Sequence, residues 1–118
     1  MQIISEKITL EELKSMSEKM FGRLVKAVVD VEQEIMAIDA GLHADEEYLL
    51  LEKGSQQEHL WGINIFPDQF GTSDWIEFDS IINLRPRQNN RSRSIDDIEL
   101  QKKIVTIVNK LVIHGKTQ

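Results

Sequence analysis

The alternation of apolar and polar positions is clearest in the middle of the chain. From Trp75 to Leu84 the even positions are mainly apolar and the odd positions include acids, which is the two-residue period of a half-buried strand. The run Leu60 to Phe66 is apolar on both faces, and Pro67 and Gly71 are typical of the turn between two strands. The pattern therefore predicts a central hairpin.

The N-terminal half shows the same two-residue period. Residues 25–31 alternate and are rich in valine, and an apolar run resumes over residues 35–40, so a second hairpin is expected with its turn at Glu32 to Glu34. That turn lacks glycine, the usual residue of a tight hairpin turn. A short strand is expected at Gln2 to Ile4.

Three helices follow from apolar spacing and end signals. Thr9 and Glu12 form a capping box before a helix over about Leu10 to Phe21. A short helix is expected over His43 to Lys53. A last helix is expected to be capped by Ser94, with Asp96 and Asp97 in its first turn and Gly115 near its end. Its apolar positions are Ile104, Ile107, Val108 and Leu111.

These elements predict an α+β fold. We expect one domain over residues 1–118, with an antiparallel or mixed sheet of four to five strands, two longer helices and one short helix. The length of 118 residues is enough for one core, and 41% hydrophobic with 29% charged residues is ordinary for a globular protein.

Composition excludes several classes of chemistry. The chain has no cysteine, so disulfides, thiol catalysis and cysteine-bound metals are ruled out. Acids in the first dozen residues are incompatible with a secretory signal, and no segment reaches the roughly 18 apolar residues of a membrane span. We therefore expect a cytoplasmic protein with no membrane partner, no cofactor and no metal.

Charge is the strongest functional signal. The net charge is −6, which argues against general nucleic-acid binding, but the stretch 85–93 carries +4 and the remainder −10. Guanidinium and amide groups in this stretch fit phosphate or carboxylate oxygens, and the helix start that follows favours anions. We therefore expect a phosphate-bearing ligand or a protein partner to bind Arg85, Arg87, Asn89, Asn90, Arg91 and Arg93.

Two alternatives remain open for this stretch. The arginines could pair with the protein's own acids, such as Glu77, Asp79, Asp96 and Asp97, in an ordinary surface network. An exposed sheet edge or the aromatic end of the central hairpin could instead pair with a second copy of the chain, which would make a homo-oligomer.

A separate alternative is a small hydrolase-like enzyme or a metal-binding protein. His43, Glu46 and Glu47 fall three and four residues apart, so they share one side of the expected short helix. An imidazole and two carboxylates could transfer protons or bind a metal, with the arginines holding an oxyanion. The same acids also suit the positive end of a helix dipole. Catalysis requires His43 to share a cleft with the arginine stretch.

The segments KAVVDVEQEIMAIDAGLHADEEYLLLEKGS, LWGINIFP and IEFDSIINLRPRQNNRSR together resemble an uncharacterised family of small single-domain prokaryotic proteins. The resemblance spans most of the chain. It implies a compact stand-alone domain with no assigned catalysis, and it assigns no functional residue. The charge reversal, and not the resemblance, is the reason to expect binding or regulation through the arginine-rich stretch.

Overall fold

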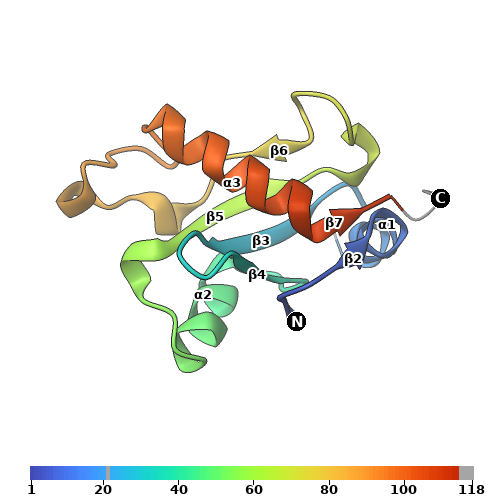
Figure 1. Ribbon diagram of the computed structural model, residues 1–118, viewed down its shortest axis with the longest axis horizontal. Helices are drawn as coiled ribbons and strands as arrows, with labels where there is room; N and C mark the ends of the chain where they lie inside the picture. Colours follow the sequence, from blue (N-terminus) through green and yellow to red (C-terminus); the bar gives the residue numbers. More distant parts are fainter. Residues whose placement is uncertain (21, 115–118) are drawn as a thin grey trace.

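The computed structural model describes residues 1–20 and 22–114, which form a five-stranded sheet with helices on both faces (Figure 1). Its strand order is β1-β4-β3-β5-β6, and each neighbouring pair is antiparallel. The strands are β1 (Gln2–Ile4), β3 (Val25–Asp30), β4 (Ile35–Ile38), β5 (Leu60–Ile65) and β6 (Ile76–Glu77). A small parallel sheet joins β2 (Ile8–Thr9) to β7 (Val112–Ile113). The predicted α+β class is confirmed.

The three α-helices are α1 (Leu10–Met20), α2 (His43–Glu52) and α3 (Ile98–Leu111). The capping box before α1 is present, since Glu12 N donates to Thr9 Oγ1 at 3.0 Å and Thr9 N donates to Glu12 Oε1 at 2.9 Å. Phe21 and Gly115, expected at two helix ends, lie outside the described residues. Within the part of the chain that is described, no helix is long and apolar enough to cross a bilayer.

The start of α3 differs from the prediction. Asp97, and not Ser94, is the N-cap, and its side chain accepts from Glu99 N and Leu100 N. Ser94 is used by the preceding loop, where its amide donates to Ser92 Oγ and its carbonyl accepts from Asn90. The N–H groups expected to favour an external anion are therefore partly satisfied by a carboxylate of the chain itself.

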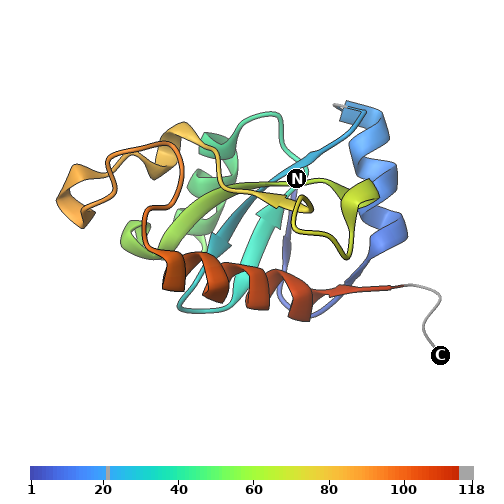
Figure 2. The same ribbon diagram turned by 90° about the horizontal axis from the view of Figure 1, so that it is seen from above.

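The sheet has one apolar and one mixed face. On one face, Ala27 and Val29 of β3 face α3, within a core cluster that also includes Leu13 of α1. On the other, Val28 packs with Leu50 of α2 in a much smaller cluster. Figure 2 shows α3 and α2 on opposite sides of the sheet. Successive residues of β3 thus point alternately to the apolar face and to the mixed face of the sheet.

The β3–β4 turn is organised by a buried carboxylate in place of glycine. Asp30 Oδ1 accepts from the amides of Glu32 and Gln33, both at 2.9 Å, and its Oδ2 accepts from Ser55 Oγ at 2.6 Å. Burial alone would raise the pKa of Asp30, but the bonds from Ser55, Gln33 and Glu32 together lower it. Glu34 takes the left-handed conformation, with φ 59°, so the predicted turn forms without glycine.

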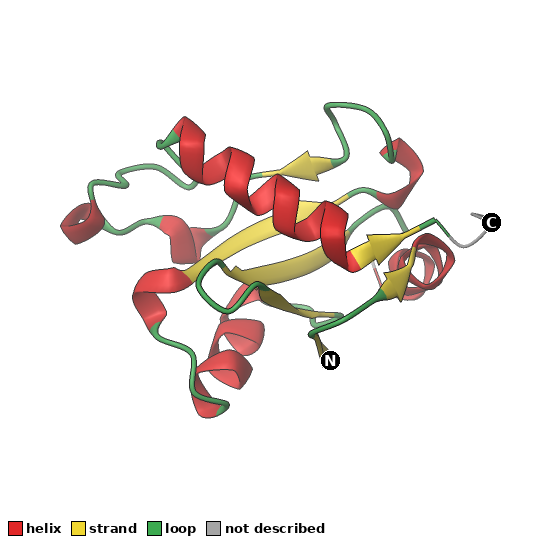
Figure 3. Cartoon of the chain, in the orientation of Figure 1, coloured by secondary structure: helices red, strands yellow, loops and turns green. Residues whose placement is uncertain are grey.

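The predicted strand from Trp75 to Leu84 is wrong beyond Glu77. Only Ile76 and Glu77 pair with β5, and a short 3₁₀ turn follows at Ile81–Asn83. Phe78 packs against the α3-side core, whereas Ile82 packs against the α2-side cluster. Two residues of equal parity thus lie on opposite faces, which a continuous strand does not allow. Figure 3 shows this segment mainly as loop.

Candidate functional site

The segment 79–96, called the arginine loop below, projects beyond the end of the sheet (Figures 1 and 2). Its base is closed by Ser80 N donating to Arg93 O at 3.0 Å. Its tip is closed by two backbone bonds between Arg85 and Asn90, of 2.8 and 3.1 Å. Between them lies a 3₁₀ turn, Pro86–Gln88, followed by Asn89 with φ 60°. The loop is therefore a compact, closed unit.

Asn83 attaches this loop to the sheet by acting as a strand partner. Its buried amide accepts from Gly62 N at 2.8 Å and donates to Gly62 O at 3.0 Å, which are the two bonds a neighbouring strand would make. A Cβ atom at Gly62 would lie 2.6 Å from Cβ and Oγ of Ser80. Glycine is thus required for the loop to approach β5 this closely.

Arg85 was expected to bind a ligand, but its guanidinium points inward. Nε donates to Ile82 O at 2.9 Å, Nη1 donates to Gln57 O at 2.7 Å, and Nη2 donates to Leu60 O. The guanidinium carbon lies 4.3 Å from the centre of the Trp61 ring. Burial lowers the pKa of Arg85, and nearby Glu47 opposes that shift. The guanidinium N–H groups of Arg85 therefore already donate to backbone carbonyl oxygens of the protein itself.

Asn90 also serves the loop itself. It is buried, its Nδ2 donates to the carbonyls of Asn83 and Ser94 at 2.7 Å each, and its Oδ1 accepts from Asp96 N at 2.7 Å. Asp96 in turn accepts from Ser92 Oγ and Arg91 N, and these two bonds lower its pKa. Asn90 and Asp96 thus hold the returning half of the loop.

Three arginines remain at the surface of the loop. Arg93 Nε donates to Asp79 at 2.7 Å, with 56% of its side chain exposed. Arg87 and Arg91 are exposed, and within residues 1–20 and 22–114 their side chains make no ion pair or hydrogen bond. Asn89 is exposed beside them. The surface available to an anion is therefore formed by Arg87, Asn89 and Arg91, with Arg93 shared.

The structure separates the three candidates on α2. His43 and Glu46 are buried on the side that faces the sheet, whereas Glu47 is half-buried and accepts from Gln57 at 3.4 Å. Glu46 Oε2 accepts from Ala40 N at 3.0 Å, but Oε1 is buried and has no hydrogen-bond partner among the described residues. Burial raises the pKa of Glu46 to about 9, so its carboxyl is neutral at pH 7.

His43 lies on the same side of the sheet as the base of the arginine loop. Its Nε2 donates to Ile63 O at 2.8 Å, which places the proton of the neutral ring on Nε2. Burial lowers the pKa of His43, and both Asp79 and Arg93 lie close enough to affect it. His43 is only 7% exposed. Among the described residues, no three histidine, aspartate or glutamate side chains are placed to share a metal ion.

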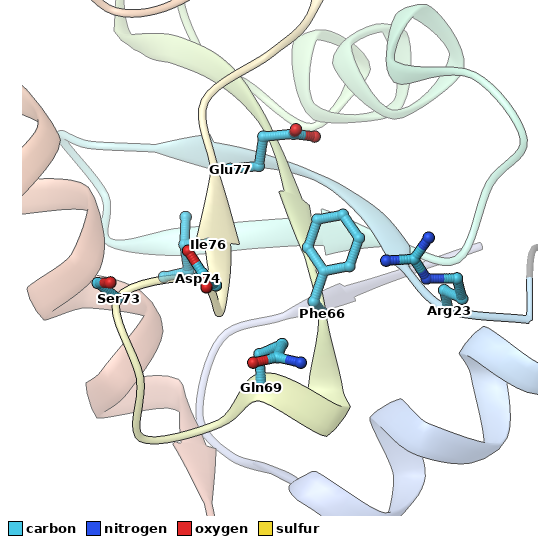
Figure 4. Close-up of a pocket in the computed structure, with 7 residues that line it drawn as sticks. All are labelled: Arg23, Phe66, Gln69, Ser73, Asp74, Ile76 and Glu77. Atoms are coloured by element: carbon cyan, nitrogen blue, oxygen red, sulfur yellow. The ribbon is translucent and has the colours of Figure 1, made fainter.

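A polar groove of about 360 Å³ lies at the other end of the central hairpin and was not predicted from the sequence. Figure 4 shows the Phe66 ring between Arg23 on one side and Asp74 on the other, with Gln69 and Glu77 completing the wall. Arg23 comes from the segment before β3 and the others from the β5–β6 hairpin. Only the antiparallel pairing of β3 with β5 brings the two together, so no local motif marks the groove.

Comparison with known proteins places the chain in a family. The family described as "Protein of unknown function (DUF5674)" matches residues 2–111, and the chain belongs to it. No curated protein and no solved structure gives a significant match. The match covers nearly all of the sheet and helices, in agreement with a single uncharacterised domain.

Proposed function

We propose that this protein is a small binding module of the prokaryotic cytoplasm that engages a phosphate-bearing ligand through the arginine loop. The observation that carries the proposal is the exposure of Arg87 and Arg91 on a projecting, closed loop of an otherwise acidic chain. Guanidinium groups match phosphate oxygens in shape and charge. The absence of cysteine is compatible with a reducing compartment.

Division of labour among the polar residues supports this role. Asn83, Arg85 and Asn90 hold the loop through bonds to backbone atoms, so the loop keeps its shape without help from Arg87 or Arg91. A rigid loop loses little conformational entropy when a ligand binds, which improves affinity. The binding set is therefore Arg87, Asn89 and Arg91, with a contribution from Arg93 when Asp79 releases it.

A hydrolase based on His43 and Glu46 is a weaker candidate. The imidazole is almost fully buried and already donates to a backbone carbonyl, and the Glu46 carboxyl lies beneath α2. A substrate would have to displace α2 or the loop to reach either group. The observations favour a role for both residues in the fold.

The proposal is tested by titrating pyrophosphate, a phosphoserine peptide, a glutamate-rich peptide and a short single-stranded oligonucleotide against three proteins. These are the natural chain, the double variant R87E/R91E, and the control K102E/K103E, which changes net charge equally on exposed positions of α3. Phosphate-bearing probes should bind the natural chain, with salt-sensitive affinity.

The loop variant should lose about tenfold or more in affinity, since it removes charge-assisted hydrogen bonds. The control should stay within about twofold, because Lys102 and Lys103 are exposed positions outside the arginine loop and salt screens such charges. Negligible binding of every probe by the natural chain rejects the proposal. Equal losses in both variants also reject it, because the effect would then come from net charge alone.

A further inference from the structure

The groove beside β6 carries opposite charges on its two sides. Arg23 lies on one side of the Phe66 ring, and Asp74 lies on the other (Figure 4). Within residues 1–20 and 22–114, neither the Arg23 side chain nor the Asp74 side chain makes an ion pair or a hydrogen bond. A ligand that carries both a positive and a negative group complements these two separated charges in one groove.

The acidic side of the groove is held in place by the fold. Asn64 is buried, and its Nδ2 donates to Glu77 Oε1 at 2.8 Å and to Asp79 O at 3.3 Å. The remaining oxygen of Glu77, Oε2, makes no hydrogen bond in the described part of the chain. Because Asn64 sits opposite Glu77 in the β5–β6 pairing, the carboxylate is oriented before any ligand arrives.

The floor of the groove is equally well defined. Phe66 N donates to Trp75 O at 2.8 Å, and Gln69 N donates to Phe66 O at 2.9 Å. Both backbone polar groups of Phe66 are therefore hydrogen-bonded, which fixes the backbone that carries the ring. The Arg23 guanidinium carbon lies 5.8 Å from the Phe66 ring centre, a cation–π distance that keeps the cation near the ring. The groove thus combines a cation, an aromatic surface and two carboxylates.

We propose that this groove binds a small zwitterion of the α-amino-acid class. The ligand carboxylate pairs with Arg23, its ammonium group lies between Asp74 and Glu77, and its side chain packs on the Phe66 ring. The volume of about 360 Å³ is at the lower end of ligand sites, which suits a molecule of this size. The groove does not include Arg87, Asn89 or Arg91 and does not depend on their function.

The test uses three probes that share one phenylethyl skeleton and differ in the charged groups on it. L-Phenylalanine carries both groups, 3-phenylpropanoate lacks the ammonium group, and phenethylamine lacks the carboxylate. Each is titrated into the ¹⁵N-labelled chain up to about 10 mM, a range in which weak binding of a few contacts is still measurable. L-Phenylalanine should give saturable shifts at the amides of residues 66–77, and each single-charge probe should bind about tenfold or more weakly.

Two groove variants and one matched control sharpen the result. R23Q and D74N/E77Q should each lower the affinity for L-phenylalanine about tenfold or more, because each removes one of the two charged contacts. R87Q, in the arginine loop, should leave it unchanged, which separates this site from the proposed phosphate site. Circular dichroism confirms that each variant is folded, and R23K serves as a milder change that keeps the charge and should retain part of the affinity.

The proposal fails if L-phenylalanine gives no saturable shifts. It also fails if R23Q binds as tightly as the natural chain, or if all three probes bind equally. The last result would indicate an apolar contact with the ring alone.

Discussion

Within residues 1–20 and 22–114, the α3 face of the sheet is covered by a cluster of 21 buried apolar residues, whereas the α2 face has only four, together with buried polar side chains. Those polar groups include His43, Glu46, Asn64 and Asn83. Apolar burial is non-directional and scales with area, so the α3 face supplies stability that tolerates small changes of geometry. The α2 face depends on hydrogen bonds and protonation states, because unsatisfied buried polar groups are costly.

This difference bears on function. The arginine loop and α2 are both attached to the polar face, through Asn83 and His43. Directional bonds fix the position of an attached loop more closely than apolar contacts do, because each bond has a preferred distance and angle. The polar face therefore positions the loop, while the apolar face keeps the domain folded.

The largest expected effect concerns the α3 face. Ile104 of α3 is fully buried, and replacing it with alanine should lower the free energy of unfolding by about 2–5 kcal/mol, since it leaves a cavity. The loss should be the same at pH 6 and pH 8, because no titratable group is involved. Urea denaturation at both pH values measures it. A loss that changed strongly with pH would contradict the apolar character of this face.

On the α2 face, the pKa of Glu46 makes stability depend on pH. Its folded-state pKa of about 9 exceeds the ordinary value of 4.5, so the folded protein retains a proton that the unfolded chain releases. This contribution is fully present below pH 4.5 and is lost as pH rises toward 9. The E46Q variant has no carboxyl at this position and therefore lacks this pH dependence. Its free energy of unfolding, relative to that of the natural chain, should rise by about 2–4 kcal/mol as the pH increases from 5 to 8.

Urea denaturation across this range measures the difference, with E47Q as the control at the neighbouring, half-buried position. The pH dependence of E47Q should follow that of the natural chain. If the free energies of unfolding of E46Q and of the natural chain changed in parallel with pH, the buried carboxyl would not be the source of the pH dependence. His43 works in the opposite direction, because its lowered pKa reduces stability as pH falls below about 6.5.

The smallest effect concerns the attachment of the arginine loop. Replacing Asn83 with alanine removes the partners of Gly62 N and Gly62 O and should cost about 1–3 kcal/mol. Hydrogen exchange distinguishes this from general destabilisation. The Gly62 amide should exchange faster by a larger factor than the amide of Ile63, which lies on the β3 side of the strand. Equal acceleration of both amides would contradict the proposed side-chain pairing.

Local patterns were sufficient for most of the fold. The valine alternation of β3 and the capping box of α1 act between residues a few positions apart, so a sequence displays them directly. The predicted strand from Trp75 to Leu84 was wrong beyond Glu77 because the partner of Gly62 is the side chain of Asn83 and not a backbone strand. The apolar alternation continues through this segment all the same, because it records which positions are apolar and not which backbone groups are hydrogen-bonded.

For the candidate site, the sequence showed the cluster of arginines, but it did not show which of them hold the loop and which are exposed to a ligand. Arg85 and Arg87 are equivalent in the sequence, yet Arg85 is bound by a carbonyl 28 positions away at Gln57, whereas Arg87 is exposed. The groove at Arg23 was missed for the same reason. Its charges come from segments that only the sheet brings together.

The sequence by itself determined the α+β class, the acidic body with one basic segment, and the apolar stripes that build the core, because these depend on composition and short-range period. Tertiary structure alone decided which guanidinium groups face solvent, which carboxyl groups are buried, and where opposite charges meet. Those outcomes depend on desolvation and on hydrogen bonds between distant residues, and both exist only after the chain has folded.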